Sequence, residues 1–563
     1  MRKRVAVVGS GPTCIFALQK LITSHKRFDI TIFEASDVAG KGTPYQRGIN
    51  DDAMMSNIPS IEIPHLPQTL VSWLENQPDE YLKELELDRC AISDRAFYPR
   101  VVVGDYLRQQ FETIVSEGML SGHIIRVRES CRVLDIIPKR SRFLVKFGDL
   151  PQFDFFDYVI AATGHSFPTA QESSPGYFNS PWPATALQSI SSEKIGILGT
   201  SLSAIDAVMT LATKFGKFNR MHDGQLRYEI GENYAEFEVI MMSRKGLLPE
   251  ADFYFPIPYE NPLICTKQAV TERISLGSSR LLDDVFDLFR QEVAIADPEY
   301  AQLIHLDELT VDTFATAYYG VRDKTDPFVW AKSNLDEAKR NYEAKHSIAW
   351  RYAILITHEI IEMAVNHFTT EDYARFNQSF KGIFADEYAT VPHISIERLL
   401  AMHEAKRLRV AGLGDQSEIV NVNHERGAVV KFNGRKLVFN TFIDATGQKT
   451  LSAADIPFAC LKNKGLVSSA RTKISNGNQR RTGGIDIDNQ CRPLVAGIKA
   501  IRGLYLPAVS YLLHKKPFVQ GITSAADLGE IVGQSIIDDA SRTRGGRMAY
   551  RAAKLNDNFE VAA

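Results

Sequence analysis

The sequence has few cysteines, little net charge and no long apolar run, and each absence excludes a class of protein. Its six cysteines stand far apart without a Cys-x-x-Cys pair, which excludes an adjacent redox dithiol and any recognisable zinc-binding spacing. Such scattered thiols are typical of the reduced cytoplasm. The formal net charge of −3 gives no reason to expect a nucleic-acid partner. No stretch has the length of a membrane span, so we expect no membrane contact.

The composition is that of an ordinary globular protein. The chain has 563 residues, which is enough for two to four domains, and 44% of them are hydrophobic. We find no repeat of fixed period and no long low-complexity segment. Residues 541–563 mix arginine, glycine and alanine without apolar periodicity and are predicted to form a flexible tail. These features leave the oligomeric state open, including a homo-oligomer.

The first forty residues follow the order of a dinucleotide-binding βαβ unit. A short apolar strand runs into Gly9-Ser10-Gly11-Pro12-Thr13, and an apolar helix pattern follows. Gly9 permits the tight turn, Gly11 lets backbone N–H groups approach a pyrophosphate, and Pro12 suits the first helical position. The next strand ends in Glu34, where a carboxylate can accept hydrogen bonds from an unphosphorylated ribose. This context favours a dinucleotide site over an ordinary strand-to-helix turn.

A second, degenerate copy of the motif begins near residue 194. A strand enters Gly199-Thr200-Ser201-Leu202-Ser203-Ala204, in which the first, third and sixth positions are all small. The partner strand ends in Ser243-Arg244-Lys245, so this site ends in cations where the first ends in an acid. A 2′-phosphate carries a charge of about −1.5 to −2, which Glu34 would repel and Arg244 would attract. The asymmetry assigns FAD to the first site and NADPH to the second.

Four other stretches are candidates for the flavin surroundings. The glycine-rich loop 39–45 either covers the cofactor or is a surface turn. Met55–Pro59 places polar side chains inside an apolar stretch, which suits a flavin wall and equally suits core followed by a turn. The strand that starts at Tyr158 ends in Ala162-Thr163-Gly164-His165 at the sheet edge where ligands lie, and we interpret His165 as a loop residue rather than a catalytic acid or base. A helix starting at Gly521 would aim its N–H groups at the flavin pyrimidine.

The elements predict an α/β fold with two Rossmann-like dinucleotide-binding domains, a β meander and an inserted helical lobe. Residues 127–137 and 437–444 are each predicted to form one strand. Three- and four-residue apolar spacing predicts helices from about 279 to 389. The expected domain order is 1–185 for the first part of the FAD-binding domain, 186–265 for the NAD(P)H-binding domain, 266–395 for the helical insertion and 396–540 for a return to both nucleotide-binding domains.

These motifs together resemble the bacterial FAD-NAD(P)-binding protein family, and in particular an uncharacterised branch found in enteric bacteria. The matching stretches span nearly the whole chain and are Gly9-Ser10-Gly11-Pro12-Thr13, Met55-Ser56-Asn57-Ile58-Pro59, Tyr98-Pro99-Arg100, Ala162-Thr163-Gly164-His165, Gly199-Thr200-Ser201-Leu202-Ser203, Ser243-Arg244 and Pro517-Phe518-Val519-Gln520-Gly521. The family is similar to flavin-containing and N-hydroxylating monooxygenases.

The resemblance implies roles for individual residues. Gly9, Gly11 and Glu34 would hold the adenosine diphosphate of FAD, Asn57 and Thr163 would lie near the flavin, and Ser201 and Arg244 would hold NADPH. Within the same motifs, further candidate cofactor-binding residues are Ser10, Pro12, Thr13, Ser56, Arg100, Gly164, Gly199, Ser203 and Gly521. The chain departs from the pattern at Cys14, which replaces the third glycine and predicts slightly wider helix packing. It also departs at Ser201 and near Leu506, where the Gly-Asp pair common in flavoproteins is missing.

The sequence thus predicts an NADPH-dependent flavoprotein oxidoreductase. The resemblance favours a monooxygenase that hydroxylates a small, nucleophilic, nitrogen-containing substrate through a flavin C4a-hydroperoxide. A reductase or oxidase that passes electrons to another acceptor is the alternative enzyme, and a non-catalytic FAD-binding redox sensor is the alternative of another class. No catalytic side chain and no metal site stand out, because the cofactor itself carries this chemistry.

Overall fold

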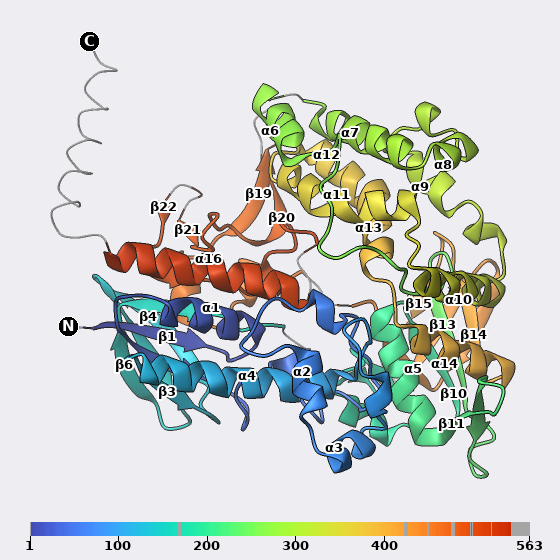
Figure 1. Ribbon diagram of the computed structural model, residues 1–563, viewed down its shortest axis with the longest axis horizontal. Helices are drawn as coiled ribbons and strands as arrows, with labels where there is room; N and C mark the ends of the chain where they lie inside the picture. The colour runs from blue at the N-terminus through green and yellow to red at the C-terminus, as the bar shows by residue number, and fades with distance from the viewer. Residues whose placement is uncertain are drawn as a thin grey trace.

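The computed structural model describes residues 2–165, 170–277, 279–420, 426–447, 450–473, 479–495, 497, 499–518 and 521–541. Within these ranges the chain forms two parallel sheets and a separate group of helices (Figure 1). The predicted tail from residue 542 onward lies outside the described residues, as do Val519 and Gln520 of the last family motif.

The first domain is built on a five-stranded parallel sheet in the order β23-β7-β1-β2-β3. Its central strands are mostly apolar and buried, whereas one edge strand carries the exposed Arg126 and Val127. They are β1 (Lys3–Val8), β2 (Phe28–Phe33), β3 (Ile124–Arg128), β7 (Tyr158–Ala161) and β23 (Leu504–Tyr505). An antiparallel meander packs against the sheet through Phe33, whose ring contacts Phe147 and Phe156; it consists of β4 (Val133–Lys139), β5 (Arg142–Phe147) and β6 (Gln152–Phe156).

Helices α1 (Pro12–Ile22) and α16 (Gly521–Ser541) lie side by side, although they come from opposite ends of the chain (Figure 1). Glycines on α16 let the two backbones come very close. A Cβ atom at Gly529 would lie 2.8 Å from the carbonyl oxygen of Thr13, and one at Gly533 would lie 3.1 Å from that of Ala17. Helix α4 (Arg100–Leu120) also contacts α1. The helix that follows the first glycine turn is therefore fixed from two sides.

The second domain repeats the topology of the first. Its sheet has the order β14-β13-β10-β18-β9-β8, so that β14-β13-β10-β18 corresponds to β3-β2-β1-β7. The strands are β8 (Glu172–Ser174), β9 (Tyr177–Phe178), β10 (Lys194–Leu198), β13 (Glu238–Ser243), β14 (Leu408–Gly412) and β18 (Thr441–Asp444), and only β8 pairs antiparallel. A meander again precedes the last core strand, with β15 (Glu418–Val420), β16 (Ala428–Phe432) and β17 (Arg435–Phe439). The helices of this domain are α5 (Leu202–Phe215) and α14 (His393–Glu404). The predicted pair of dinucleotide-binding folds is confirmed.

Most of the chain between β13 and β14 forms a helical lobe. Its helices are α6 (Lys267–Leu276), α7 (Leu281–Ala296), α8 (Pro298–Leu303), α9 (Phe314–Tyr319), α11 (Ala349–Val365), α12 (Thr370–Arg375) and α13 (Lys381–Tyr388). The lobe has its own aromatic core, which includes Phe286, Phe289, Phe380 and Phe384. Helix α10 (Pro327–Ala344) packs instead on α14 in the core of the second domain. None of the described helices is long and apolar enough to cross a membrane.

The smaller elements lie around these three parts. The helices among them are α2 (Leu70–Glu75), α3 (Asp79–Glu84) and α15 (Ala459–Asn463), and the strands pair as the hairpins β11 (Gly216–Arg220) with β12 (Leu226–Ile230), β19 (Ser469–Lys473) with β20 (Gln479–Ile485) and β21 (Leu494–Val495) with β22 (Lys499–Ala500).

Two strand predictions are wrong, because each predicted run changes sheet partway. Residues 127–137 contribute to both β3 and β4, and the chain turns between them at Ser130, which has a φ of +49°. Residues 437–444 contribute to β17 and β18, which are separated at Asn440. β17 pairs antiparallel with β16, whereas β18 pairs parallel with β10. Apolar alternation alone does not reveal such a change of partner.

Candidate dinucleotide sites

The first glycine turn has no room for side chains. Gly9 has a φ of +92°, and a Cβ atom there would lie 2.3 Å from the carbonyl oxygen of Ala162. Gly11 is the N-cap of α1 and provides no side-chain cap, while Pro12 and Thr13 form the first helical positions. No side chain therefore caps the first backbone N–H groups of α1, which lie at the positive end of the helix. This turn fits the pyrophosphate of a dinucleotide, which must approach bare backbone.

Glu34 is held rigidly at the end of β2. One carboxylate oxygen accepts hydrogen bonds from the backbone N–H of Ser10 at 3.1 Å and from its hydroxyl at 2.6 Å. The other accepts from the backbone N–H and the hydroxyl of Ser36 at 2.8 and 2.9 Å. The side chain is buried. A carboxylate fixed beside the glycine turn would repel a 2′-phosphate, which is the feature that favours FAD here.

The loop 39–45 packs directly on the first turn. The N–H of Gly40 donates to the hydroxyl of Ser10 at 2.9 Å, and a Cβ atom at Gly42 would lie 2.9 Å from Cδ of Pro12. Lys41 anchors the loop from the other side through an ion pair with Asp105 at 2.6 Å. Of the two interpretations of this loop, the structure therefore favours a cover of the nucleotide turn.

The second turn reproduces this geometry. Gly199 has a φ of +127°, and a Cβ atom there would lie 2.6 Å from the carbonyl oxygen of Ala445, the counterpart of Ala162. Ser201 is the N-cap of α5 and makes no side-chain cap, so the leading N–H groups are again available, and Ser203 lies in the first turn. The hydroxyl of Thr200 donates to that of Ser243 at 3.0 Å, as Ser10 does to Glu34. Sequence reasoning missed Thr200, although it occupies the same motif position as Ser10.

The two cations at the end of β13 differ in their availability. The Arg244 side chain is 64% exposed, and its nearest carboxylate, Asp415, is 3.8 Å away and itself exposed. Lys245 lies 3.0 Å from the carboxylate of Asp323 and 3.9 Å from the ring centre of Tyr319. Because Lys245 is already paired, Arg244 is the cation better placed to meet a phosphate at this strand end.

The remaining candidate residues lie around the first sheet. Thr163 follows β7 and borders the glycine turn, since its Cα would be 3.7 Å from a Cβ at Gly9. The carbonyl of Gly164 accepts a hydrogen bond from the Ser510 hydroxyl at 3.0 Å. Gly521, with a φ of +72°, begins α16.

The predicted flavin wall is part core and part exposed turn. Ser56 is buried, and its hydroxyl accepts from the N–H of Ile58 at 3.2 Å, so it stabilises its own turn. The backbone N–H of Ser56 donates to the carbonyl of Tyr98 at 2.9 Å, which ties the turn to the segment before α4. Asn57 is exposed and free to meet a ligand.

Arg100 connects the two domains. From the first residue of α4 its guanidinium reaches the Asp206 carboxylate on α5 at 2.7 Å, and the two side chains are 14% and 5% exposed. Burial raises the pKa of Asp206 to about 6, although Arg100 opposes the shift. Arg398 adds a second link by donating to the carbonyl of Ala53 at 2.9 Å. Sequence reasoning missed Asp206, because nothing in the local pattern marks a contact between domains.

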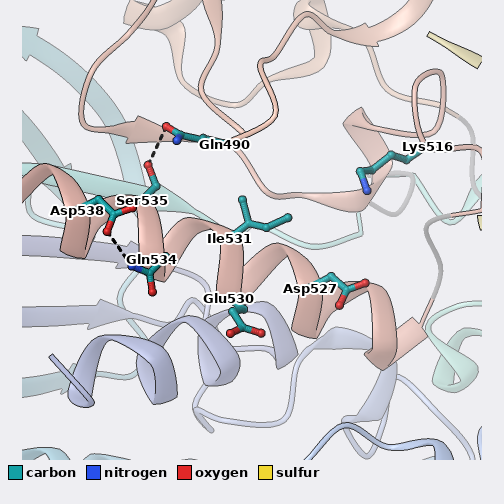
Figure 2. A pocket seen from close by; sticks show the side chains of 8 residues that line it. All are labelled: Gln490, Lys516, Asp527, Glu530, Ile531, Gln534, Ser535 and Asp538. Atoms are coloured by element: carbon teal, nitrogen blue, oxygen red, sulfur yellow. Dashed lines mark hydrogen bonds between the residues drawn. The ribbon is translucent and has the colours of Figure 1, made fainter. Parts of the chain in front are cut away.

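A separate groove of about 480 Å³ follows the outer face of α16 (Figure 2). There the Ser535 hydroxyl donates to the side-chain carbonyl of Gln490 at 3.0 Å, and Gln534 donates to Asp538 at 2.7 Å. The groove is lined by Gln490, Lys516, Asp527, Glu530, Ile531, Gln534, Ser535 and Asp538. None of the candidate cofactor-binding residues is among them, so this groove is distinct from the glycine turns.

Comparison with known proteins agrees with this geometry. Residues 6–166 match the FAD-NAD(P)-binding domain family, and residues 266–388 match the YdhS-like middle domain. The Escherichia coli (strain K12) protein YdhS is 37% identical over 543 residues, which cover 96% of this chain and 99% of that protein.

Solved structures resemble the chain more distantly. The ornithine N-hydroxylase KtzI of Kutzneria sp. 744 is 13% identical, with a TM-score of 0.48. That alignment covers 96% of this chain and all of the KtzI chain. The bacillithiol disulfide reductase Bdr of Bacillus cereus is 10% identical, with a TM-score of 0.40 and the same coverage.

The domain match confirms FAD and a nicotinamide dinucleotide, NAD(P)H, as the predicted cofactors, and it supports a flavin-dependent oxidoreductase. The identity to YdhS over nearly the full length also confirms the enteric branch to which the motifs pointed. The chain belongs to the YdhS family of FAD-NAD(P)-binding proteins.

Proposed function

We propose that the protein is an NADPH-dependent flavin monooxygenase that hydroxylates a small, nitrogen-containing substrate. One observation carries the cofactor part of this proposal: two glycine turns of the same geometry end in groups of opposite charge. Glu34 is locked beside the first turn, and Arg244 is exposed beside the second. The first turn therefore suits the unphosphorylated ribose of FAD, and the second suits the 2′-phosphate of NADPH.

The residues of this chain would bind and orient the two cofactors. The uncapped start of α1 would meet the FAD pyrophosphate, and the uncapped start of α5 would meet that of NADPH. When bound, FAD supplies hydride acceptance and dioxygen activation. The pair Arg100–Asp206 would hold the two domains in a fixed orientation, which matters because hydride transfer needs close approach of the two rings.

The helical lobe supports a monooxygenase because it is packed firmly against both domains. On the side of the second domain, the Glu250 carboxylate lies 3.2 Å from Arg322 and 3.1 Å from Arg351, and Arg351 pairs with Glu387 at 2.8 Å. All four side chains are buried. Breaking such a network would leave uncompensated charges, so the lobe should not swing freely.

On the side of the first domain, the lobe receives the segment before α16. The ring of Phe518 enters the aromatic core and contacts Phe376 and Phe384, while Lys516 lies 3.5 Å from Glu362. A lobe held at both sides can exclude water from the space between the domains. Monooxygenases need that exclusion more than simple reductases do, because water and protons divert the activated oxygen.

An NADPH oxidation assay under air tests the proposal. Candidate amines, purines and amino acids are added one at a time, and hydroxylated product and hydrogen peroxide are both measured. A monooxygenase shows substrate-stimulated NADPH consumption with matching hydroxylated product. Consumption that requires a quinone and gives no hydroxylated product would establish the alternative reductase. Absence of flavin reduction by NADPH would establish a redox sensor.

A further inference from the structure

A second cavity, of about 430 Å³, lies where the first domain, α10 and α14 meet. Three segments far apart in the sequence form its wall: the stretch that leads into α4, the last turns of α10 and the first turn of α14. Its lining residues are Ser93, Arg95, Ala96, Phe97, Lys339, Tyr342, Glu343, Pro392, His393 and Ile394. None of them is a candidate cofactor-binding residue.

Arg95 is a cation without a partner acid in this cavity. Its guanidinium stacks on Tyr254, 4.5 Å from the ring centre, and no carboxylate of the described residues forms an ion pair with it. Lys339, the other cation of the wall, is already paired with Glu397 at 2.6 Å. Stacking on an aromatic ring orients a guanidinium and leaves its N–H edge for an acceptor.

The nearby acids form no ion pair with Arg95 within the described part of the chain. Burial, together with the charge of Asp252, raises the pKa of Glu62 to about 8, and the charge of Arg95 opposes this rise, so the neutral form of Glu62 is favoured more than in an ordinary glutamate. The Asp252 carboxylate accepts hydrogen bonds from the hydroxyls of Tyr342 and Thr390 and is thereby engaged. Glu343 on the wall is exposed, so water screens its charge.

The start of α14 adds to the positive potential. Pro392 is its N-cap and provides no side-chain cap, so the N–H groups of His393 and Ile394 begin this 12-residue helix at the cavity wall. The Nε2 atom of His393 lies 2.8 Å from the carbonyl oxygen of Asp252 and donates to it. The cavity wall therefore carries these N–H donors as well as the guanidinium of Arg95.

The other walls are apolar and aromatic. Phe97, Tyr342 and Ile394 line the space together with the ring of Pro392. The ring of Tyr342 is fixed edge-on against Tyr254 and against His393, at centroid distances of 5.8 and 5.1 Å. Such a pocket has rigid flat walls and one strongly polar corner, which is the usual design of a small-molecule site.

We propose that this cavity binds a small organic acid with a flat apolar body, whose carboxylate pairs with Arg95 and whose body lies between Phe97 and Tyr342. The site is separate from the two dinucleotide turns and does not depend on the proposed monooxygenase activity. Because its walls come from the first domain and from the chain between β13 and β14, an acid bound there also bridges these parts.

Calorimetric titration of the full-length protein, with its flavin as purified, tests this site with benzoate and with benzamide, its neutral counterpart. We expect saturable binding of benzoate and binding of benzamide about tenfold weaker or more. Arg95→Ala should reduce benzoate binding to the level of benzamide, and Arg95→Lys should restore part of it. Arg340→Ala removes an exposed arginine on the same helix as Tyr342 and should leave both affinities unchanged.

The same titrations contain the outcomes that overturn the proposal. Equal affinity for benzoate and benzamide would show that no cation recognises the acid. Benzoate binding that survives Arg95→Ala and perturbs the flavin absorption would place the acid at the flavin instead. Absence of saturable benzoate binding to the wild-type protein would also refute the site. A circular dichroism spectrum and a flavin content equal to wild type show that each variant is folded.

Discussion

The ion pair between Arg100 and Asp206 allows a prediction whose size follows from the structure. Burial moves the pKa of Asp206 from its ordinary value of 3.8 to about 6 in the folded protein. At pH 7 and above, this corresponds to about 3 kcal/mol of lost stability at 1.36 kcal/mol per pH unit. Since the folded-state pKa is raised, this cost is absent well below pH 4, grows between about pH 4 and pH 6 as the carboxyl of the unfolded chain ionises first, and is complete above pH 6.

Replacing Arg100 with alanine should increase that cost. Both effects that lower the pKa of Asp206 come from Arg100, so the variant buries a carboxylate without a partner. We expect Arg100→Ala to lower the free energy of unfolding by about 3–5 kcal/mol at pH 8 and by clearly less at pH 5, where Asp206 is protonated. Asp206→Asn should remove the pH dependence that belongs to this group. Combining the two substitutions should recover part of the stability that Arg100→Ala loses at pH 8.

Thermal and urea unfolding at pH 5 and pH 8 measure these differences. Anaerobic stopped-flow reduction of the flavin by NADPH measures the effect on domain orientation. Arg100→Ala should slow flavin reduction even where the variant is fully folded. A destabilisation that is the same at both pH values, or a double variant as unstable as Arg100→Ala, would refute the reasoning.

Three other predictions address the nucleotide sites. Arg244→Ala should raise KM for NADPH by about 5- to 150-fold, equivalent to about 1–3 kcal/mol, and leave KM for NADH nearly unchanged. Lys245→Ala should raise KM for NADPH less, because Lys245 is paired with Asp323. Steady-state kinetics with both nucleotides measure these values, and equal increases in KM for NADPH and NADH would contradict the site. Gly9→Ala should abolish FAD binding, whereas Gly199→Ala should retain bound FAD but no longer be reduced by NADPH. Absorption spectra measure both the bound flavin and its reduction. A Gly199→Ala protein whose flavin is reduced at the wild-type rate would contradict this prediction. Glu34→Gln should raise the dissociation constant of FAD about tenfold or more. Fluorescence titration of the apoprotein with FAD measures this constant. An unchanged affinity for FAD would contradict the assignment of Glu34 to the FAD site.

The nucleotide turns could be predicted from sequence because their requirements are local. Gly9 and Gly199 both adopt positive φ, and a Cβ atom at either would collide with a carbonyl oxygen. Only glycine fits such a position, so a glycine there predicts the conformation of the turn. The ends of β2 and β13 follow within the same unit, and their charges are visible in the sequence. The pairing of each glycine-turn strand with the next parallel strand, β1 with β2 and β10 with β13, belongs to the same units.

Contacts between distant segments could not be predicted in this way. Asp206 looks like any acid on an amphipathic helix until the fold brings α5 to the start of α4. The cavity at Arg95 depends on three segments whose meeting is fixed by the packing of α10 and α14. The prediction of one strand over residues 437–444 was wrong for a related reason. The strand with which each half pairs, and not the composition of that half, decides where β17 ends and β18 begins.

Anaerobic titration of the purified protein tests the central assignment most directly. We predict that the protein retains FAD, that its absorption near 450 nm bleaches on addition of NADPH, and that NADH bleaches it much more slowly. A colourless protein that does not retain added FAD, or flavin reduced equally well by both nucleotides, would contradict the pairing of an acid-ended FAD site with an arginine-ended NADPH site.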